Sequence, residues 1–163
     1  MTAAWVYDLA FCLHLVGAFS LVSGTVVAIV SFEAARRRTS CAEIALLLGL
    51  ARIGAVLVAG GMVFAAGFGL WLVALGHWGY GTPWVDAAIG LLALVAAIGS
   101  VGGQRPKLAR KLAAALSAQQ LPPNMELRAL LADRLSIVLN YLATAALLAI
   151  IVLMVVKPGS PHQ

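Results

Sequence analysis

Hydrophobic residues fall into four long runs that are separated by polar segments. The runs cover residues 9–32, 53–76, 83–103 and 135–156. A helix needs about 20 apolar residues to cross the hydrocarbon core of a bilayer, and each run reaches that length. Because backbone groups in lipid must be paired within the chain, each run is expected to be a helix. The pattern predicts an all-α polytopic membrane protein with a four-transmembrane-helix, up-down-up-down bundle.

The polar segments carry signals for helices that extend beyond the membrane. Ser40 and Glu43 have capping-box spacing, which predicts a second helix over residues 41–76. Asn124 is expected to cap a helix that continues through the fourth run to Val156. The bundle is therefore expected to have helical extensions on one side of the membrane.

Small residues recur on one face of several predicted helices. Such faces let transmembrane helices approach closely and associate through van der Waals contact. The predicted packing faces are Gly17, Gly24 and Ala28 in the first run, Gly61, Ala65 and Gly69 in the second, and Gly99 and Gly103 in the third.

Composition excludes a soluble globular protein and adds an orientation. Of the 163 residues, 63% are hydrophobic and 10% are charged, far from the soluble average. All 11 Lys and Arg residues except Lys157 lie in the two loops 33–52 and 104–134. This is the positive-inside pattern, which predicts cytoplasmic loops, both termini outside and a bacterial inner-membrane location for one membrane domain, residues 1–163.

The basic loops also indicate what the protein contacts. The net charge of +5 arises from these loops, so we expect no nucleic acid partner. Anionic headgroups attract nearby Lys and Arg residues, and the lipid bilayer itself is the first partner. A homodimer or a larger membrane complex is a further expectation. The residues expected at headgroups are Arg36, Arg37, Arg38, Arg105, Lys107, Arg110 and Lys111.

His14 is the candidate cofactor-binding and metal-binding residue. It lies inside the first run, where ionisable side chains are costly and therefore suggest function. A neutral imidazole can bind haem iron or copper, or relay a proton. The simpler interpretation is a packing histidine hydrogen-bonded to a neighbouring backbone carbonyl or to a polar side chain of the fourth run. Haem b and copper are the candidate cofactors.

The fourth run contains the polar intramembrane residues Asn140, Tyr141 and Thr144. Hydrogen bonds between helices explain such residues without a function, and a polar cavity is the alternative. No residue is assigned as catalytic, because Asp8 and Asp86 lie on the predicted outer side and the other four carboxylates lie on the inner side.

Several segments together resemble a known family. They are HLVGA from His14 followed by Gly24, GFGLWLV from Gly67, PWV from Pro83 and MVVKPG from Met154. These segments are similar to those of the bacterial predicted integral membrane proteins called domain of unknown function 2269. The resemblance covers nearly the whole chain and implies the membrane fold without implying an activity.

More distantly, a histidine followed by glycine in the first span is similar to copper-resistance D-like proteins and to HemJ-type haem-binding membrane proteins. That similarity implies a haem or copper ligand at His14 alone. A second ligand would come from Met62, His77, Tyr141 or His14 of a second protomer.

Three functions follow from these patterns. The first is a structural or accessory subunit of the bacterial inner membrane. The alternatives are a haem b or copper protein that uses His14, and a transporter of small substrates or ions.

Overall fold

The computed structural model describes residues 2–76 and 82–158 of the chain. Within these ranges it is all-helical, and four of its helical stretches are long and apolar enough to cross a membrane. This confirms the predicted fold class. The helices are α1 (Thr2–Arg36), α2 (Cys41–Leu75), α3 (Pro83–Gly102), α4 (Gln104–Ala118), α5 (Met125–Leu131) and α6 (Arg134–Val156).

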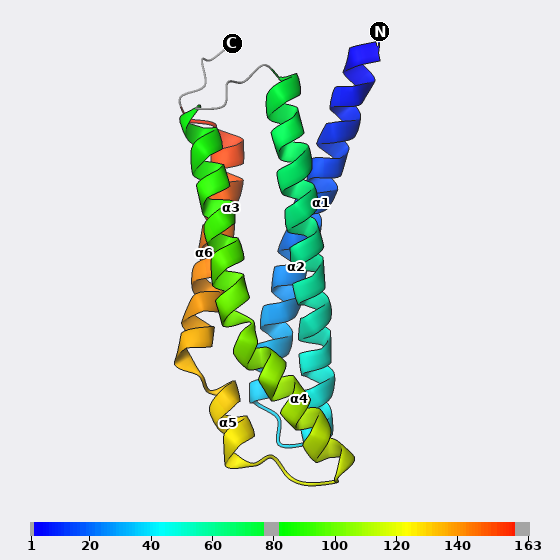
Figure 1. Ribbon diagram of the computed structural model, residues 1–163, viewed down its shortest axis with the longest axis vertical. Coiled ribbons are helices and arrows are strands. Elements are labelled where there is room, and N and C mark those ends of the chain that lie inside the picture. Colours follow the sequence, from blue (N-terminus) through cyan, green and yellow to red (C-terminus); the bar gives the residue numbers. More distant parts are fainter. Residues whose placement is uncertain (1, 77–81, 159–163) are drawn as a thin grey trace.

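The four long helices are arranged as two antiparallel pairs (Figure 1). Helices α1 and α2 pack together along most of their length, and α3 packs on α6. Contacts between the pairs are much sparser, both from α1 to α6 and from α2 to α3. The start of α1 and the end of α6 lie at the same end of the molecule, which we call the terminal end. The turn 37–40, α4 and α5 lie at the opposite end, which we call the basic end.

Glycines bring α1 and α2 into backbone contact. A Cβ added to Gly17 would lie 2.5 Å from the Ala65 nitrogen, and one added to Gly61 would lie 2.6 Å from the Leu21 nitrogen. Helices can approach this closely only where side chains are absent. The predicted packing faces of the first and second runs are therefore confirmed.

The glycine face predicted for the third run is wrong. A Cβ on Gly99 would meet nothing within 4 Å, whereas one on Gly102 would lie 3.3 Å from Leu139 of α6. Helix α3 therefore packs on α6 through the face that contains Gly102, and the spacing of Gly99 and Gly103 does not mark this face.

Three clusters of apolar side chains hold the helices together. The central cluster joins all four long helices and contains Leu21, Val58, Met62, Ala65, Leu91, Leu92, Val95, Ala146, Leu147 and Ile150. The basic-end cluster packs α4 and α5 on the ends of α1 and α2, around Phe32, Ala35, Ile44, Leu48, Ala109, Ala113, Leu127 and Leu131. At the terminal end Trp84 and Val85 pack with Val73 and Met154.

Two helix signals in the polar loops have different outcomes. The Asn124 side chain accepts a hydrogen bond from the Leu127 nitrogen at 2.8 Å, which confirms it as a cap. Ser40 precedes α2 but makes no side-chain cap bond, so the predicted capping box is wrong. The Glu43 carboxylate lies 3.7 Å from Nε of Arg38 instead, because the opposite charge competes with the backbone for it.

The predicted continuous fourth helix is also wrong. Helix α5 ends at Leu131, and α6 begins at Arg134 after Asp133. The Asp133 carboxylate accepts hydrogen bonds from the Ser136 nitrogen at 3.0 Å and from the Ser136 hydroxyl at 2.7 Å. A carboxylate that satisfies these donors starts a new helix, which allows α5 to turn and pack against α4.

Candidate functional site

His14 joins α1 to α2 near the terminal end. Its Nδ1 lies 2.9 Å from the carbonyl oxygen of Ala65, and the ring is half-buried. A Cβ on Gly69 would lie 3.1 Å from the imidazole, so this glycine leaves the room that the ring occupies. The hydrogen bond to a backbone carbonyl that was expected of a packing histidine is therefore present.

This hydrogen bond also fixes what His14 could do chemically. A carbonyl oxygen only accepts, so the contact requires the proton on Nδ1, and in a neutral imidazole Nε2 then keeps its lone pair. Histidines that bind metals use the same arrangement, with the other ring nitrogen donating to a carbonyl or carboxylate. Among the described residues, however, there is no group of three or more His, Cys, Asp or Glu side chains suited to a metal ion.

The residues expected to supply a second haem or copper ligand beside His14 lie in separate parts of the chain. Met62 belongs to the central cluster, and Tyr141 lies near the start of α6, towards the basic end. His77 lies outside the described residues. The structure does not bring His14 together with the polar residues of the fourth run. His14 bonds to Ala65 of α2, whereas Asn140 and Tyr141 lie beside the last turns of α1 and Thr144 bonds to the Asn140 carbonyl.

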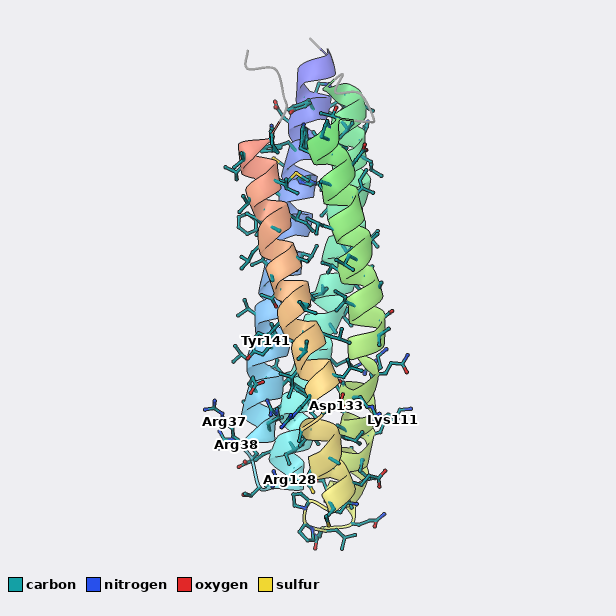
Figure 2. The ribbon with its side chains drawn as sticks, turned by 90° about the vertical axis from the view of Figure 1, so that its left-hand side faces the viewer. Arg37, Arg38, Lys111, Arg128, Asp133 and Tyr141 are labelled. Atoms are coloured by element: carbon teal, nitrogen blue, oxygen red, sulfur yellow. The ribbon has the colours of Figure 1, made fainter. Side chains whose placement is uncertain are left out.

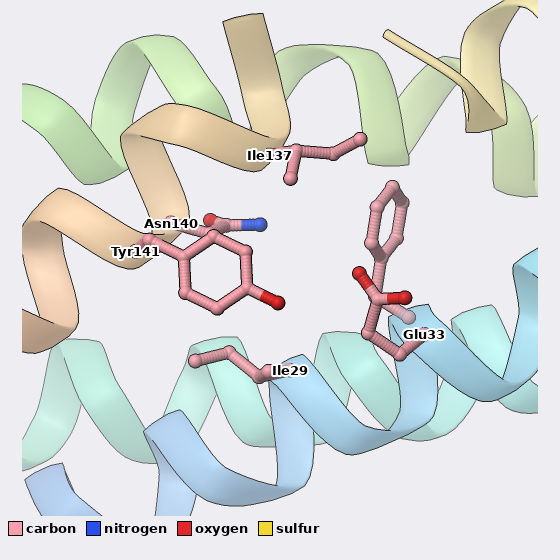
Figure 3. Close-up of a pocket in the computed structure, with 6 residues that line it drawn as sticks. Ile29, Glu33, Ile137, Asn140 and Tyr141 are labelled. Atoms are coloured by element: carbon pink, nitrogen blue, oxygen red, sulfur yellow. The ribbon is translucent and has the colours of Figure 1, made fainter. Parts of the chain in front are cut away.

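A small crevice lies between α1 and α6 nearer the basic end (Figure 3). Its volume of about 10 Å³ has room for about one water molecule. Figure 3 shows the Asn140 amide and the Tyr141 hydroxyl directed towards Glu33 across this space. The lining residues are Ile29, Phe32 and Glu33 of α1 and Ile137, Asn140 and Tyr141 of α6.

Glu33 is held by Arg36 of the same helix. The Arg36 Nη1 donates to both carboxylate oxygens, at 2.9 and 3.1 Å, and about a third of each side chain is exposed. The sequence interpretation placed Glu33 only among the inner carboxylates and missed its place beside Asn140 and Tyr141. The sequence signalled only the ion pair, through an acid three residues before a base, and not the contact with the fourth run.

The predicted polar residues of the fourth run therefore separate into two kinds. Asn140 and Tyr141 line the crevice, whereas the Thr144 hydroxyl donates to the Asn140 carbonyl at 2.9 Å within α6. This last bond satisfies Thr144 inside its own helix and explains it without a function.

The basic residues gather at the basic end (Figure 2). Arg37, Arg38, Lys107 and Lys111 are exposed, while Ala109 and Ala113 turn the opposite face of α4 into the basic-end cluster. Figure 2 shows Arg37, Arg38 and Lys111 extending outward at this end. The predicted headgroup residues thus lie at one end of the bundle, with Arg36, Arg105 and Arg110 among them.

Asp133 also lies at the basic end, and its pKa is lowered. The hydrogen bonds from the Ser136 hydroxyl and nitrogen, and more weakly the positive charge of Arg105, lower the pKa of Asp133 below its ordinary value of 3.8. Asp133 is thus a charged cap at neutral pH, and its role is to begin α6.

The comparison with known proteins agrees with this architecture. No curated protein and no solved structure matches the chain. The family described as predicted integral membrane protein, DUF2269, matches residues 9–158. The chain therefore belongs to this family and is an integral membrane protein with four transmembrane helices.

Proposed function

We propose that this protein is a structural or accessory subunit of the bacterial inner membrane. The observation that carries the proposal is the separation of apolar side chains from basic side chains along the bundle. Aliphatic residues fill the centre of the bundle, and the Lys and Arg residues lie almost entirely at the basic end. Such a chain offers a rigid membrane anchor with a charged helical end.

The central cluster favours an anchor over a transporter. A transport path needs polar groups continuing through the bilayer centre, where ionisable and polar side chains mark such pathways. Leu21, Met62, Val95 and Leu147 meet at this level in the bundle. Contacts among these aliphatic side chains support association of the helices and not passage of a solute.

The proposed orientation places the basic end in the cytoplasm and both termini outside. Helices α1 and α2 each have 35 residues. Such a helix is about 52 Å long, whereas the hydrocarbon core measures about 30 Å. The basic end therefore extends through the headgroup region, where anionic lipids attract each Lys or Arg by about 1 kcal/mol.

Labelling of single cysteines tests this orientation. In a background with Cys12→Ala and Cys41→Ala, Thr2→Cys should react with a membrane-impermeant maleimide added to intact spheroplasts. Gln119→Cys, which follows α4, should react only after the membrane is opened. The reverse labelling would show that the orientation is inverted.

Lipid dependence tests the headgroup contact. Thermal unfolding in nanodiscs should shift upward as phosphatidylglycerol replaces a neutral lipid, and the shift should shrink at high salt because exposed charges are screened. Lys107→Gln combined with Lys111→Gln should reduce it. An unchanged shift in this variant would contradict a headgroup role for these two residues.

Native electrophoresis tests the role as a subunit. The tagged chromosomal protein, extracted from membranes with a mild detergent, should migrate as a larger species than the purified chain. Migration identical to that of the purified chain would contradict a place in a complex.

A second candidate function is binding of haem b or copper by His14. The observation that favours it is the hydrogen bond of Nδ1 to Ala65, which leaves Nε2 for a ligand. The test is an absorption spectrum with metal analysis of the purified protein. A Soret band or stoichiometric copper that is lost in His14→Ala and kept in Cys12→Ala would establish this function, and a colourless, metal-free wild type would exclude it.

A further inference from the structure

The crevice between α1 and α6 opens at the level where the membrane surface is expected. Glu33 follows directly after the apolar run 9–32, and Tyr141 lies two turns into α6. Tyr141 is 60% exposed and the Glu33 side chain is 31% exposed, so both reach the outer surface of the bundle beside this space. A molecule entering there would come from the lipid and not from the interior of the protein.

Glu33 gives this opening an acceptor. A carboxylate has about four lone-pair positions, and the single nitrogen Nη1 of Arg36 approaches both of its oxygens. Figure 3 shows the carboxylate turned towards the crevice. The positions that Arg36 does not take can accept from a cationic donor there.

Arg36 does not line the crevice, but its contact with Glu33 brings a donor of opposite charge beside it. Its guanidinium has five N–H groups, and Nη1 alone makes the contacts with Glu33. Guanidinium groups bind phosphate well, and the Asn140 amide and Tyr141 hydroxyl add neutral hydrogen-bonding groups at the crevice. A carboxylate beside a guanidinium is complementary to a ligand that carries an ammonium and a phosphate.

Aliphatic side chains continue from the crevice towards the membrane centre. On α1, Val26 and Val22 follow Glu33 along one face and are exposed. On α6, Leu148 and Val152 follow Tyr141 in the same way and are also exposed. These two rows provide surfaces on which acyl chains can lie below a headgroup held at the crevice.

We propose that the open side of this crevice, outside its one-water interior, is a binding site for a zwitterionic aminophospholipid, with Glu33 binding the primary ammonium and Arg36 the phosphate of its headgroup. The carboxylate selects this ligand over an anionic phospholipid, since Glu33 would repel a headgroup that lacks the ammonium. The site is separate from the exposed Lys107 and Lys111 of α4, so it does not depend on the function proposed above.

Native mass spectrometry of the full chain tests the proposal. The protein is released from nanodiscs containing equal amounts of phosphatidylethanolamine and phosphatidylglycerol, and the lipids that stay bound are counted. Because the exposed lysines of the basic end also attract phosphatidylglycerol, the measure is the ratio of retained phosphatidylethanolamine to phosphatidylglycerol in wild type compared with Glu33→Gln. We expect this ratio to be about fivefold to tenfold higher in wild type, as one net hydrogen-bonded contact would give.

Glu43→Gln is the matched control, because Glu43 also lies beside an arginine but is outside the crevice. It should keep the wild-type preference. Tyr141→Phe removes only a hydroxyl from the exposed side of the crevice and should reduce the preference even if Glu33→Gln does not fold. A ratio of the two retained lipids that is the same in wild type and in both crevice variants would overturn the proposal.

Discussion

Gly24 of α1 and Gly54 of α2 face each other so closely that neither position has room for a side chain. A Cβ on Gly24 would lie 2.7 Å from the Gly54 carbonyl oxygen, and one on Gly54 would lie 2.6 Å from the Gly24 carbonyl oxygen. Both obstacles are backbone atoms, which cannot move without shifting a helix. The contact therefore fixes the distance between α1 and α2 and, through it, the place of His14 beside Ala65.

Two adjacent glycines of α2 allow a direct test of this interface. Gly61→Ala should destabilise the protein by about 1–3 kcal/mol, the usual cost of overpacking, because its Cβ would lie 2.6 Å from the Leu21 nitrogen. Gly60→Ala should be neutral or slightly stabilising, since a Cβ there meets nothing within 4 Å. Unfolding of the purified protein in increasing denaturing detergent measures both, and equal effects would contradict the interface.

The Asn124 cap predicts a local effect at the basic end. Asn124→Ala removes the bond to the Leu127 nitrogen and should cost about 1 kcal/mol, whereas Asn124→Asp keeps an acceptor and should be nearly neutral. Hydrogen exchange of α5 amides measures the change. If the Ala and Asp variants exchange alike, the side-chain cap does not hold α5.

The sequence predicted the membrane helices well because lipid leaves the backbone few alternatives. Residues 53–76, with their apolar side chains and glycines, allow only a helix in a bilayer. The start of α2 at Cys41 was likewise correct, although its reason, the Ser40 capping box, was not. Helix α2 begins directly after the turn between α1 and α2, and this start does not depend on a hydrogen bond from the Ser40 side chain.

Local patterns failed where the result depended on how separate helices meet. Leu130 and Leu131 continue the apolar pattern into the fourth span, so the sequence did not show that Asp133 would interrupt it. Glu33 was recognised as an inner carboxylate, but its place opposite Asn140 depends on the packing of one helix pair beside the other. No spacing within a single run contains that information.

Asp133 predicts an effect of acid on the start of α6. Its pKa is lowered in the folded protein, so its stabilising effect is present above the ordinary value of 3.8 and is lost as the pH falls through the folded value. Hydrogen exchange at Ser136 should therefore accelerate on acidification below about pH 4, once corrected for intrinsic exchange.

Asp133→Asn is the control for this acid effect. An asparagine oxygen still accepts at the cap but does not titrate in this range, so exchange at Ser136 should become insensitive to acid. Acid sensitivity that persists unchanged in Asp133→Asn would assign the effect to another group.

The end of α4 gives a prediction in the stabilising direction. Gln120 has a φ of 55°, a left-handed conformation that costs a side-chain-bearing residue about 1–2 kcal/mol and costs glycine little. It closes α4 in the usual way, since the Leu121 nitrogen donates to the Leu116 carbonyl at 2.9 Å. Gln120→Gly should therefore raise the free energy of unfolding by about 1 kcal/mol.

The neighbouring residue separates this effect from a general effect of glycine. Gln119 has a φ of −90°, so Gln119→Gly relieves no strain and should lower stability by a fraction of a kcal/mol through the entropy of the unfolded chain. Thermal unfolding of both variants, followed by hydrogen exchange of α4, measures the difference. If Gln120→Gly is no more stable than Gln119→Gly, the left-handed residue is not a source of strain at the basic end.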